Sequence, residues 1–449
     1  MKQTETKTLV QKAYVIDVNM GYGHSRAAYA LKDLGAGQVI CANNYHGIPK
    51  EDRNLWRETC KLYETVSRLK NIPVFGPVVF DAMDHFQQIE HFYPRRDLSK
   101  PNLQVCQNYL FIKRGLGKHL IERLALSPLP IVATFFTIAQ AADFYNYPEE
   151  IYCVTTDADI SRSWAPMDPK KSRIKYFASN GRVVERLKLY GVREDHIYLT
   201  GFPLPKECIG GASAHILKED LMQRICHLDP RGIFIEHYKK TIAAEIGGIY
   251  CKKRTALRPL TILYTVGGAG AQKSLGVEII KSLSKRILRC EVRLILMAGV
   301  RREVARYFTE SATRLGLKRM IGNGIMIPFY KERAEYFAGF NQWLSQTDIL
   351  WTKPSELSFY CGLGLPIIMS PPIGSQEKFN QIWLQYLGAG VPQNDPRYTD
   401  EWLFDWIFSG GIARHAWNGY IEAPTHGTYR IEDHMLGRTT ISHALPLIV

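Results

Sequence analysis

The run AYVIDV at residues 13–18 is apolar and rich in β-formers, and it leads directly into NMGYGH at residues 19–24. Residues 25–34 are then rich in helix formers. A buried strand, a glycine turn and a helix in this order begin a parallel α/β sheet. We expect Gly21 and Gly23 to lie in a loop beside a ligand site, since glycine lets the backbone turn sharply and approach a ligand.

The same alternation continues through the first half of the chain. Further strand-like runs lie at residues 131–134, 151–155, 176–178 and 197–200, and helical segments separate most of them. Strands that alternate with helices predict a parallel sheet covered on both faces. Ligands of such a sheet bind at the carboxyl ends of its strands.

A second series opens in the same way, with TILYTV at residues 261–266 followed by GGAGAQ at 267–272. Its later strand-like runs lie at residues 292–297, 325–327, 348–352 and 366–369. We therefore predict an α/β protein of two Rossmann-like domains facing a cleft. The predicted parts are a first domain at residues 1–205, a helical inter-domain segment at 206–258 and a second domain at 259–449, whose tail returns to the first domain.

Charge and cysteine content narrow the partners and the compartment. The formal charge is +14, and the basic residues stand in short groups, which favours anionic small molecules or an anionic membrane surface over nucleic acid. A solvated basic surface is the simple alternative. The nine cysteines are scattered singly without a C-x-x-C pair, so free thiols in a reducing cytoplasm are expected.

No signal-peptide core precedes the first strand, and no run of about eighteen apolar residues occurs. We expect a cytoplasmic protein that is soluble or peripheral on the inner face of the membrane. The apolar run PVFGPVVF at residues 73–80, with Arg95-Arg96 and Lys113-Arg114 beyond it, is either a core strand or a patch that docks on an anionic bilayer.

Two polar residues of the first series are candidates for catalysis. His24 at a helix start, beside glycines, suits a general base, although a histidine there is often only structural. Asp157 ends a strand, where it would face the ligand and orient a hydroxyl or the histidine, or cap a helix.

The first glycine loop does not fit a dinucleotide-binding fingerprint, because position 26 is Arg26 rather than a third glycine.

The second glycine loop has the character of a phosphate cradle. The second loop lacks the Lys-Ser/Thr ending of an ATPase P-loop. Its candidate ligand-binding residues are Gly267, Gly268, Gly270 and Gln272.

A polar stretch follows the strands of the second series. Amides and carboxylates there suit the hydroxyls of a sugar, or else they simply cap the helix at residues 376–387. Its candidate residues are Lys353, Ser355, Glu356, Gln376, Glu377 and Asn380.

Taken in order, these motifs resemble the family of monogalactosyldiacylglycerol synthase, processive diacylglycerol glucosyltransferase and the GlcNAc transferase that forms lipid II. GYGHSRAA at residues 21–28 is similar to the family's opening Gly-x-Gly-His-x-x-Ala-Ala, and VTTD at 154–157 and TGFP at 200–203 follow its first domain. Lys353-Pro354, and the motif from Gln376 to Asn380, follow its second.

The resemblance implies a GT-B glycosyltransferase that moves a sugar from a nucleotide-diphosphate sugar, a UDP-sugar by expectation, to a hydroxyl of a lipid or lipid-linked acceptor. His24 would deprotonate that hydroxyl, and Gly21 and Gly23 would lie in the loop on the acceptor side. Residues 267–272 would contact the diphosphate of the donor, and Gln376, Glu377 and Asn380 would contact the transferred sugar. No cofactor and no metal ion is implied, because helix dipoles and loop amides stabilise the departing diphosphate.

One departure from the family keeps two alternatives open. Ser355-Glu356 stands where the family has a glycine pair, and Phe359 falls near its ribose-binding glutamate. Glu356 would then take over the ribose from a shifted position. A non-catalytic nucleotide-sugar-binding relative and a UDP-sugar 2-epimerase-like enzyme are the alternatives.

Overall fold

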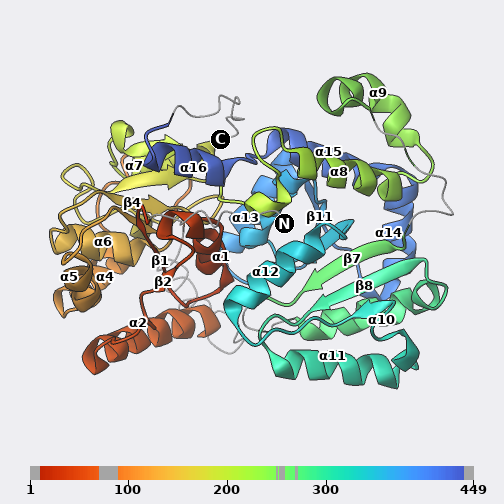
Figure 1. The fold of residues 1–449 in the computed structure, drawn as a ribbon, viewed down its shortest axis with the longest axis horizontal. Coiled ribbons are helices and arrows are strands. Elements are labelled where there is room, and N and C mark those ends of the chain that lie inside the picture. Colours follow the sequence, from red (N-terminus) through yellow and green to blue (C-terminus); the bar gives the residue numbers. More distant parts are fainter. Residues whose placement is uncertain are drawn as a thin grey trace, which may run out of the picture. The chain divides into compact units, whose positions relative to one another are not determined.

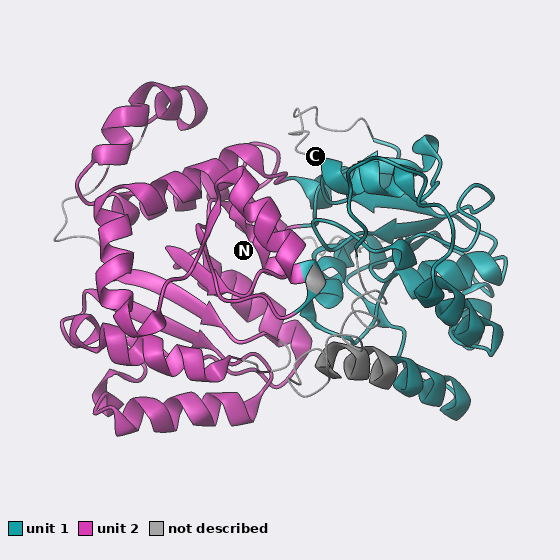
Figure 2. Ribbon diagram, turned by 180° about the vertical axis from the view of Figure 1, so that it is seen from behind, with its two compact units in different colours: residues 1–203, 374–376, 426–449 teal, residues 204–373, 377–425 magenta. Residues whose placement is uncertain are grey.

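The computed structural model describes residues 11–69, 89–248, 251, 258–267, 270 and 272–438, and for residues 60–69 and 375 the backbone only. The chain divides into two units (Figure 2). The first comprises residues 1–203, 374–376 and 426–449, and the second comprises 204–373 and 377–425. The apolar run at residues 73–80 and Gly268 lie outside the described residues.

The first unit is built on a six-stranded sheet in the order β2-β1-β3-β4-β5-β6, and every pair is parallel (Figure 1). Its strands are β1 (Tyr14–Asp17), β2 (Ile40–Cys41), β3 (Ile131–Ala133), β4 (Ile151–Val154), β5 (Lys175–Ala178) and β6 (Ile197–Leu199). Its helices are α1 (Tyr22–Ala30), α2 (Lys50–Leu69), α4 (Leu103–Lys113), α5 (Lys118–Leu124), α6 (Phe136–Phe144), α7 (Gly181–Leu189) and α16 (Gly427–Met435).

Both faces of this sheet are buried, which explains why its strands are apolar throughout. Ile16 and Ile131 belong to a core formed with α4, α5, α6 and α7. Val15 and Val132, which point the other way, pack with Ala28 of α1 and with α16. Helix α16, close to the end of the described chain, therefore covers the face that α1 alone would leave partly bare.

The second unit has a six-stranded parallel sheet in the order β12-β11-β10-β7-β8-β9. Its strands are β7 (Leu260–Thr265), β8 (Val292–Met297), β9 (Ile325–Met326), β10 (Ile349–Thr352), β11 (Ile367–Met369) and β12 (Gly390–Pro392). Its helices are α8 (His215–Leu228), α9 (Ile233–Ile246), α10 (Lys273–Leu288), α11 (Arg302–Arg314), α12 (Arg333–Leu344), α13 (Ser375–Leu387), α14 (Thr399–Phe408) and α15 (Gly411–Glu422). Read in chain order, this is the Rossmann strand order 3-2-1-4-5-6.

The prediction that residues 206–258 form a separate inter-domain segment is wrong. Helices α8 and α9 belong to the second unit, and Leu221, Ile225 and Phe234 pack in its core beside α15 and the sheet. These helices are polar on their outer side, and their apolar side covers one face of the sheet.

The expectation of free thiols is wrong for two of the cysteines. Cys226 at the end of α8 and Cys251 form a disulfide with a Cα–Cα distance of 5.5 Å. Single cysteines far apart in sequence carry no spacing signal, so the pairing could not be read from their positions. Among the described residues, no helix is both long and apolar enough to span a membrane.

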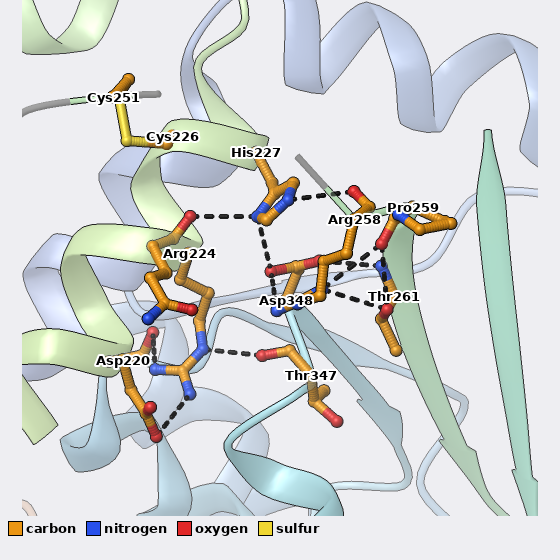
Figure 3. A network of polar contacts seen from close by, with 12 residues as sticks. Asp220, Arg224, Cys226, His227, Cys251, Arg258, Pro259, Thr261, Thr347 and Asp348 are labelled. Atoms are coloured by element: carbon orange, nitrogen blue, oxygen red, sulfur yellow. Dashed lines mark hydrogen bonds and ion pairs between the residues drawn. A yellow bond between two sulfur atoms is a disulfide. The ribbon is translucent and has the colours of Figure 1, made fainter. Parts of the chain in front are cut away.

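The buried carboxylate of Asp348 joins α8 to the starts of β7 and β10. Arg258 donates to both of its oxygens at 2.7 and 2.9 Å, the Thr261 amide donates at 2.8 Å, and His227 Nδ1 lies 3.2 Å from Oδ1 (Figure 3). Burial alone would raise the pKa of Asp348, but the contacts with His227 and Arg258 outweigh it and hold that pKa below its ordinary value.

Asp348→Asn should lower the free energy of unfolding by about 2 kcal/mol at neutral pH, because half-buried Arg258 loses its counter-charge. Since the folded-state pKa is lowered, the contribution is complete above the unfolded-state pKa and is lost as pH falls through the folded-state value. Urea unfolding should therefore show a wild-type advantage that is constant above about pH 5 and shrinks below about pH 4. An advantage that persists unchanged at the lowest pH would contradict this assignment.

Candidate functional site

Each sheet has one point where its strand order reverses, and ligands of parallel sheets bind there. In the first unit the reversal lies between β1 and β3, and in the second between β7 and β10. The predicted site residues that follow β1 and β7 are therefore placed at the edges where the fold forms a crevice.

The turn after β1 differs from the predicted loop at one of its two glycines. Gly21 has φ 150°, a conformation that L-residues with a side chain rarely adopt, and a Cβ there would meet no atom within 4 Å. Backbone geometry rather than space thus favours glycine at this position. Helix α1 already begins at Tyr22, so Gly23 lies within its first turn and not in the loop.

His24 in the first turn of α1 reaches across the reversal point to the ends of two other strands. Its Nδ1 lies 2.7 Å from the carbonyl oxygen of Thr134, which follows β3, and 3.3 Å from Oγ1 of Thr156, which follows β4. The half-buried ring packs edge-on against Phe135, with a centroid distance of 4.8 Å.

These contacts determine the tautomer of a neutral His24. A carbonyl oxygen only accepts, so the Nδ1 proton donates to Thr134 and the lone pair lies on Nε2. A ring oriented in this way is prepared to take a proton at Nε2.

Asp157 lies one residue beyond Thr156, at the end of β4 as the sequence predicts, and it is half-buried. Its backbone carbonyl accepts a hydrogen bond from Ser179 at 2.7 Å. The histidine ring contacts Thr134 and Thr156, and orientation of His24 by the Asp157 carboxylate stays a prediction.

In the second unit, the loop after β7 is bound to neighbouring strands by Gln272. Its side-chain Nε2 donates to the Pro371 carbonyl at 2.9 Å, its Oε1 accepts from Ser370 Oγ at 3.0 Å, and its carbonyl accepts from Tyr264 at 2.7 Å. Gln272 is the N-cap residue of α10. The side chain therefore fixes the loop, and its expected contact with a ligand stays a prediction.

Two cationic side chains lie against the two glycines of this loop whose φ is +66°. A Cβ on Gly267 would come within 3.0 Å of Lys353 Cε, and a Cβ on Gly270 within 3.4 Å of Arg301 Cδ. Glycine thus provides both the left-handed backbone and the space for a cation. Lys353 and Arg301 thus lie beside the loop that leads into α10, where cations and a helix N-terminus suit a diphosphate. Each of the two is paired with a carboxylate, Lys353 with Glu377 and Arg301 with Glu303 at 3.2 Å.

Lys353 and Glu377 are brought together although they are separated in sequence. Lys353 Nζ forms an ion pair with Glu377 Oε1, and Oε2 accepts from the Ile373 amide at 2.7 Å. Glu377 is 13% exposed and Lys353 is 25% exposed, so solvent reaches both. Gln376 lies half-buried in the first turn of α13.

The other candidates of this stretch support the turn after β10. Asn380 is buried and donates to the Pro354 carbonyl at 3.2 Å, which fits a positioning role better than direct sugar binding. Ser355 and Glu356 are half-buried, with Ser355 as N-cap of the 3₁₀ helix Glu356–Leu363.

Phe359, which falls near the position of the ribose-binding acid in the resembled family, is buried in that helix. It is 2% exposed, and its ring lies 4.9 Å from the ring of Trp383. The segment therefore fills this position with an apolar contact, and Glu356 is the carboxylate nearest to it in sequence.

Comparison with known proteins adds one partial family match. Residues 249–399 match a family described as a domain of unknown function (DUF6938), which is less than half of the chain. No curated protein matches the sequence.

Alignments with solved structures of low sequence identity cover most of the chain. The MnaA–UDP structure from S. aureus has 12% identity and a TM-score of 0.46, covering 95% of this chain and 96% of that chain. UDP-GlcNAc 2-epimerase from Neisseria meningitidis, bound to UDP-GlcNAc, has 10% identity and a TM-score of 0.44, and the alignment covers 85% of this chain and 97% of that chain. A glycosyltransferase from Rickettsia africae has 13% identity and a TM-score of 0.38, and the alignment covers 96% of this chain and 100% of that chain. All three TM-scores lie below 0.5, so the fold rests on the two sheets themselves and no function follows from these likenesses.

Sequence reasoning missed Arg301, Thr134 and Thr156 as site residues. Arg301 and Arg302 form one of the short basic groups, and Arg301 follows β8, so it belongs to the carboxyl edge of the sheet. Thr156 directly precedes Asp157, to which we assigned the orientation of a hydroxyl or of the histidine. In both cases the signal is position after a parallel strand.

Proposed function

We propose that this protein is a glycosyltransferase that uses a nucleotide-diphosphate sugar, by preference a UDP-sugar. The observation that carries the proposal is the placement of Lys353 and Arg301 against Gly267 and Gly270 at the reversal point of the second sheet. Two cations and a helix N-terminus would bind the diphosphate and stabilise the charge that develops as it leaves the sugar.

The first unit supplies the other half of the proposed chemistry. His24, with Nδ1 bonded to the Thr134 carbonyl, would accept the proton of the acceptor hydroxyl at Nε2. The hydroxyl oxygen would then attack the anomeric carbon as the bond to the diphosphate breaks. Glu377 remains our candidate for the transferred sugar, once it shares or gives up its contact with Lys353.

A lipid or lipid-linked acceptor, reached from an anionic membrane surface, is the finer part of the proposal. The formal charge of +14 and the family resemblance support it. Leu103 and Leu110 are 68% and 60% exposed on α4, and Lys113 and Arg114 at its end are also exposed. Apolar side chains beside basic ones suit an anionic lipid surface.

A non-catalytic nucleotide-sugar binder is the second candidate, and the buried Phe359 favours it because the expected ribose carboxylate is replaced by a packing contact. Incubation of the protein with labelled UDP-sugars and lipid extract separates the two. Transfer predicts label in the organic phase and an equal amount of released UDP. Bound but unchanged UDP-sugar would identify the binder, and a changed sugar still attached to UDP would identify an epimerase.

Removal of either cation should weaken nucleotide binding. We expect Lys353→Met and Arg301→Met each to raise the Kd for UDP by about tenfold or more, since each charge-assisted contact to a phosphate contributes roughly 1.5–3 kcal/mol. Titration calorimetry measures the change. Arg302→Met is the matched control, because Arg302 lies over the Phe329 ring and its loss should leave the Kd nearly unchanged. Equal effects of Arg301→Met and Arg302→Met would indicate a general charge effect instead of a site.

A further inference from the structure

A cavity of about 640 Å³ lies at the opposite, amino-terminal edge of the second sheet, where β7 and β8 begin. We call it the amino-edge cavity. Cysteines, arginines and an aromatic wall share its lining, which includes Cys226, Cys251, Cys290, Arg258, Arg286 and Phe404. Its volume falls in the range of small-molecule sites. The proposed donor chemistry uses none of these residues.

One cysteine of the disulfide in this cavity is buried, and the other is exposed. Cys226 is buried in the last turn of α8, directly before His227, whereas Cys251 is exposed (Figure 3). A thiolate that enters the cavity therefore reaches Cys251 more readily than Cys226.

Cys290 places a free thiol in the same cavity. It is exposed and lies in the turn between α10 and β8. Of the free cysteines that the structure describes in the second unit, Cys208 and Cys361 are buried, so Cys290 alone combines a free thiol with exposure there. A disulfide and an accessible thiol in one cavity are the components of thiol–disulfide exchange.

We propose that the amino-edge cavity is a thiol–disulfide exchange site for Cys290 and for low-molecular-weight thiols. The Cys290 thiolate attacks Cys251 Sγ, the Cys226–Cys251 bond breaks, and its electron pair passes to Cys226 Sγ, which takes up a proton. A Cys251–Cys290 disulfide and a Cys226 thiol result, with no net oxidation. An external thiol that attacks Cys251 instead gives a mixed disulfide and the same Cys226 thiol.

Charged side chains also line the cavity. Arg258 and Arg286 lie there with Glu291, and both arginines are paired, Arg258 with Asp348 and Arg286 with Glu291 and Asp400. A guanidinium group close to a sulfur atom favours its thiolate form. Phe404 and Ile407 provide an apolar wall for the stem of a small thiol such as glutathione.

Peptide mapping of the native full-length protein tests the proposal. The protein is incubated with a small molar fraction of reduced glutathione at mildly alkaline pH, quenched with acid, alkylated and digested without reduction. We expect two linkages, Cys226–Cys251 and Cys251–Cys290, with alkylated Cys226 in proportion to the second. Cys290→Ser should abolish the second linkage and leave the first.

Cys106→Ser is the matched control, because Cys106 is also exposed and free but belongs to the first unit. It should retain both linkages in the wild-type proportion. Detection of Cys226–Cys251 alone in wild type, together with a Cys290 alkylation rate that is the same in Cys251→Ser, would overturn the proposal. Rearrangement that is equally fast in urea would also overturn it, because the folded cavity would then contribute nothing.

Discussion

His24→Ala should lower the rate of sugar transfer by about 10²–10⁴-fold, the usual contribution of a positioned general base. The structure gives the reason: the ring joins the ends of β3 and β4 through Thr134 and Thr156 and leaves the lone pair of the neutral ring on Nε2. The measurement is the initial rate of labelled product at saturating donor. The Kd for UDP should stay within about twofold of wild type, since the donor cations lie on another sheet.

Two further variants separate catalysis from folding. Thr156→Val removes the longer of the two ring contacts and should cost only about threefold in rate, mainly in kcat. His119→Ala removes a half-buried histidine of the same unit that is bonded to Tyr45, and it should leave the rate unchanged. A His24→Ala enzyme with normal transfer, or with lost UDP binding and intact folding, would remove His24 from the role of base.

Arg224→Met should destabilise the second unit by about 3–5 kcal/mol, the cost of breaking a buried charge network. Arg224 is 2% exposed on α8 and donates to the carbonyl oxygens of Thr347 at 2.7 Å and Leu363 at 2.8 Å. It also donates to those of Leu344 and Gly364, at 3.2 and 3.3 Å. Its loss leaves four buried carbonyls without this donor, and a methionine of similar length cannot replace it.

Denaturant unfolding of Arg224→Met measures this cost, and Arg289→Met is the control. Arg289 is 70% exposed and lies 3.9 Å from Glu291, so its removal should change the free energy of unfolding by less than about 0.5 kcal/mol. Because Arg224 holds the end of the 3₁₀ helix that follows Lys353, its variant should also weaken UDP binding. A loss of stability similar to that of the control would mean that the carbonyls find other donors.

Most strands were predictable because they are short apolar runs of buried residues, as in Ile131–Ala133 and Ile151–Val154. The edge strand β12 was missed because Gly390–Pro392 has neither length nor a β-rich composition. The role of α8 was missed for a different reason. Its surface is polar, and only the fold reveals that Leu221 and Ile225 face the core.

Sequence reasoning could propose site residues where they follow a strand end, and not where they depend on contacts between distant residues. His24 and Lys353 were proposed in this way, and their roles stay predictions. The Lys353–Glu377 ion pair, the engagement of Gln272 with Ser370, and the position of Arg301 at Gly270 required the three-dimensional structure. Spacing in a sequence does not reveal which loops meet at one sheet edge.

Calorimetric titration of the purified protein with UDP, GDP, TDP and ADP tests the central claim most directly. The proposed donor site predicts micromolar binding of one of them, UDP by expectation, and binding that is weaker by about tenfold or more in Lys353→Met and Arg301→Met. Absence of binding by all four nucleotides would contradict a nucleotide-sugar site in the second unit, and the glycosyltransferase proposal with it.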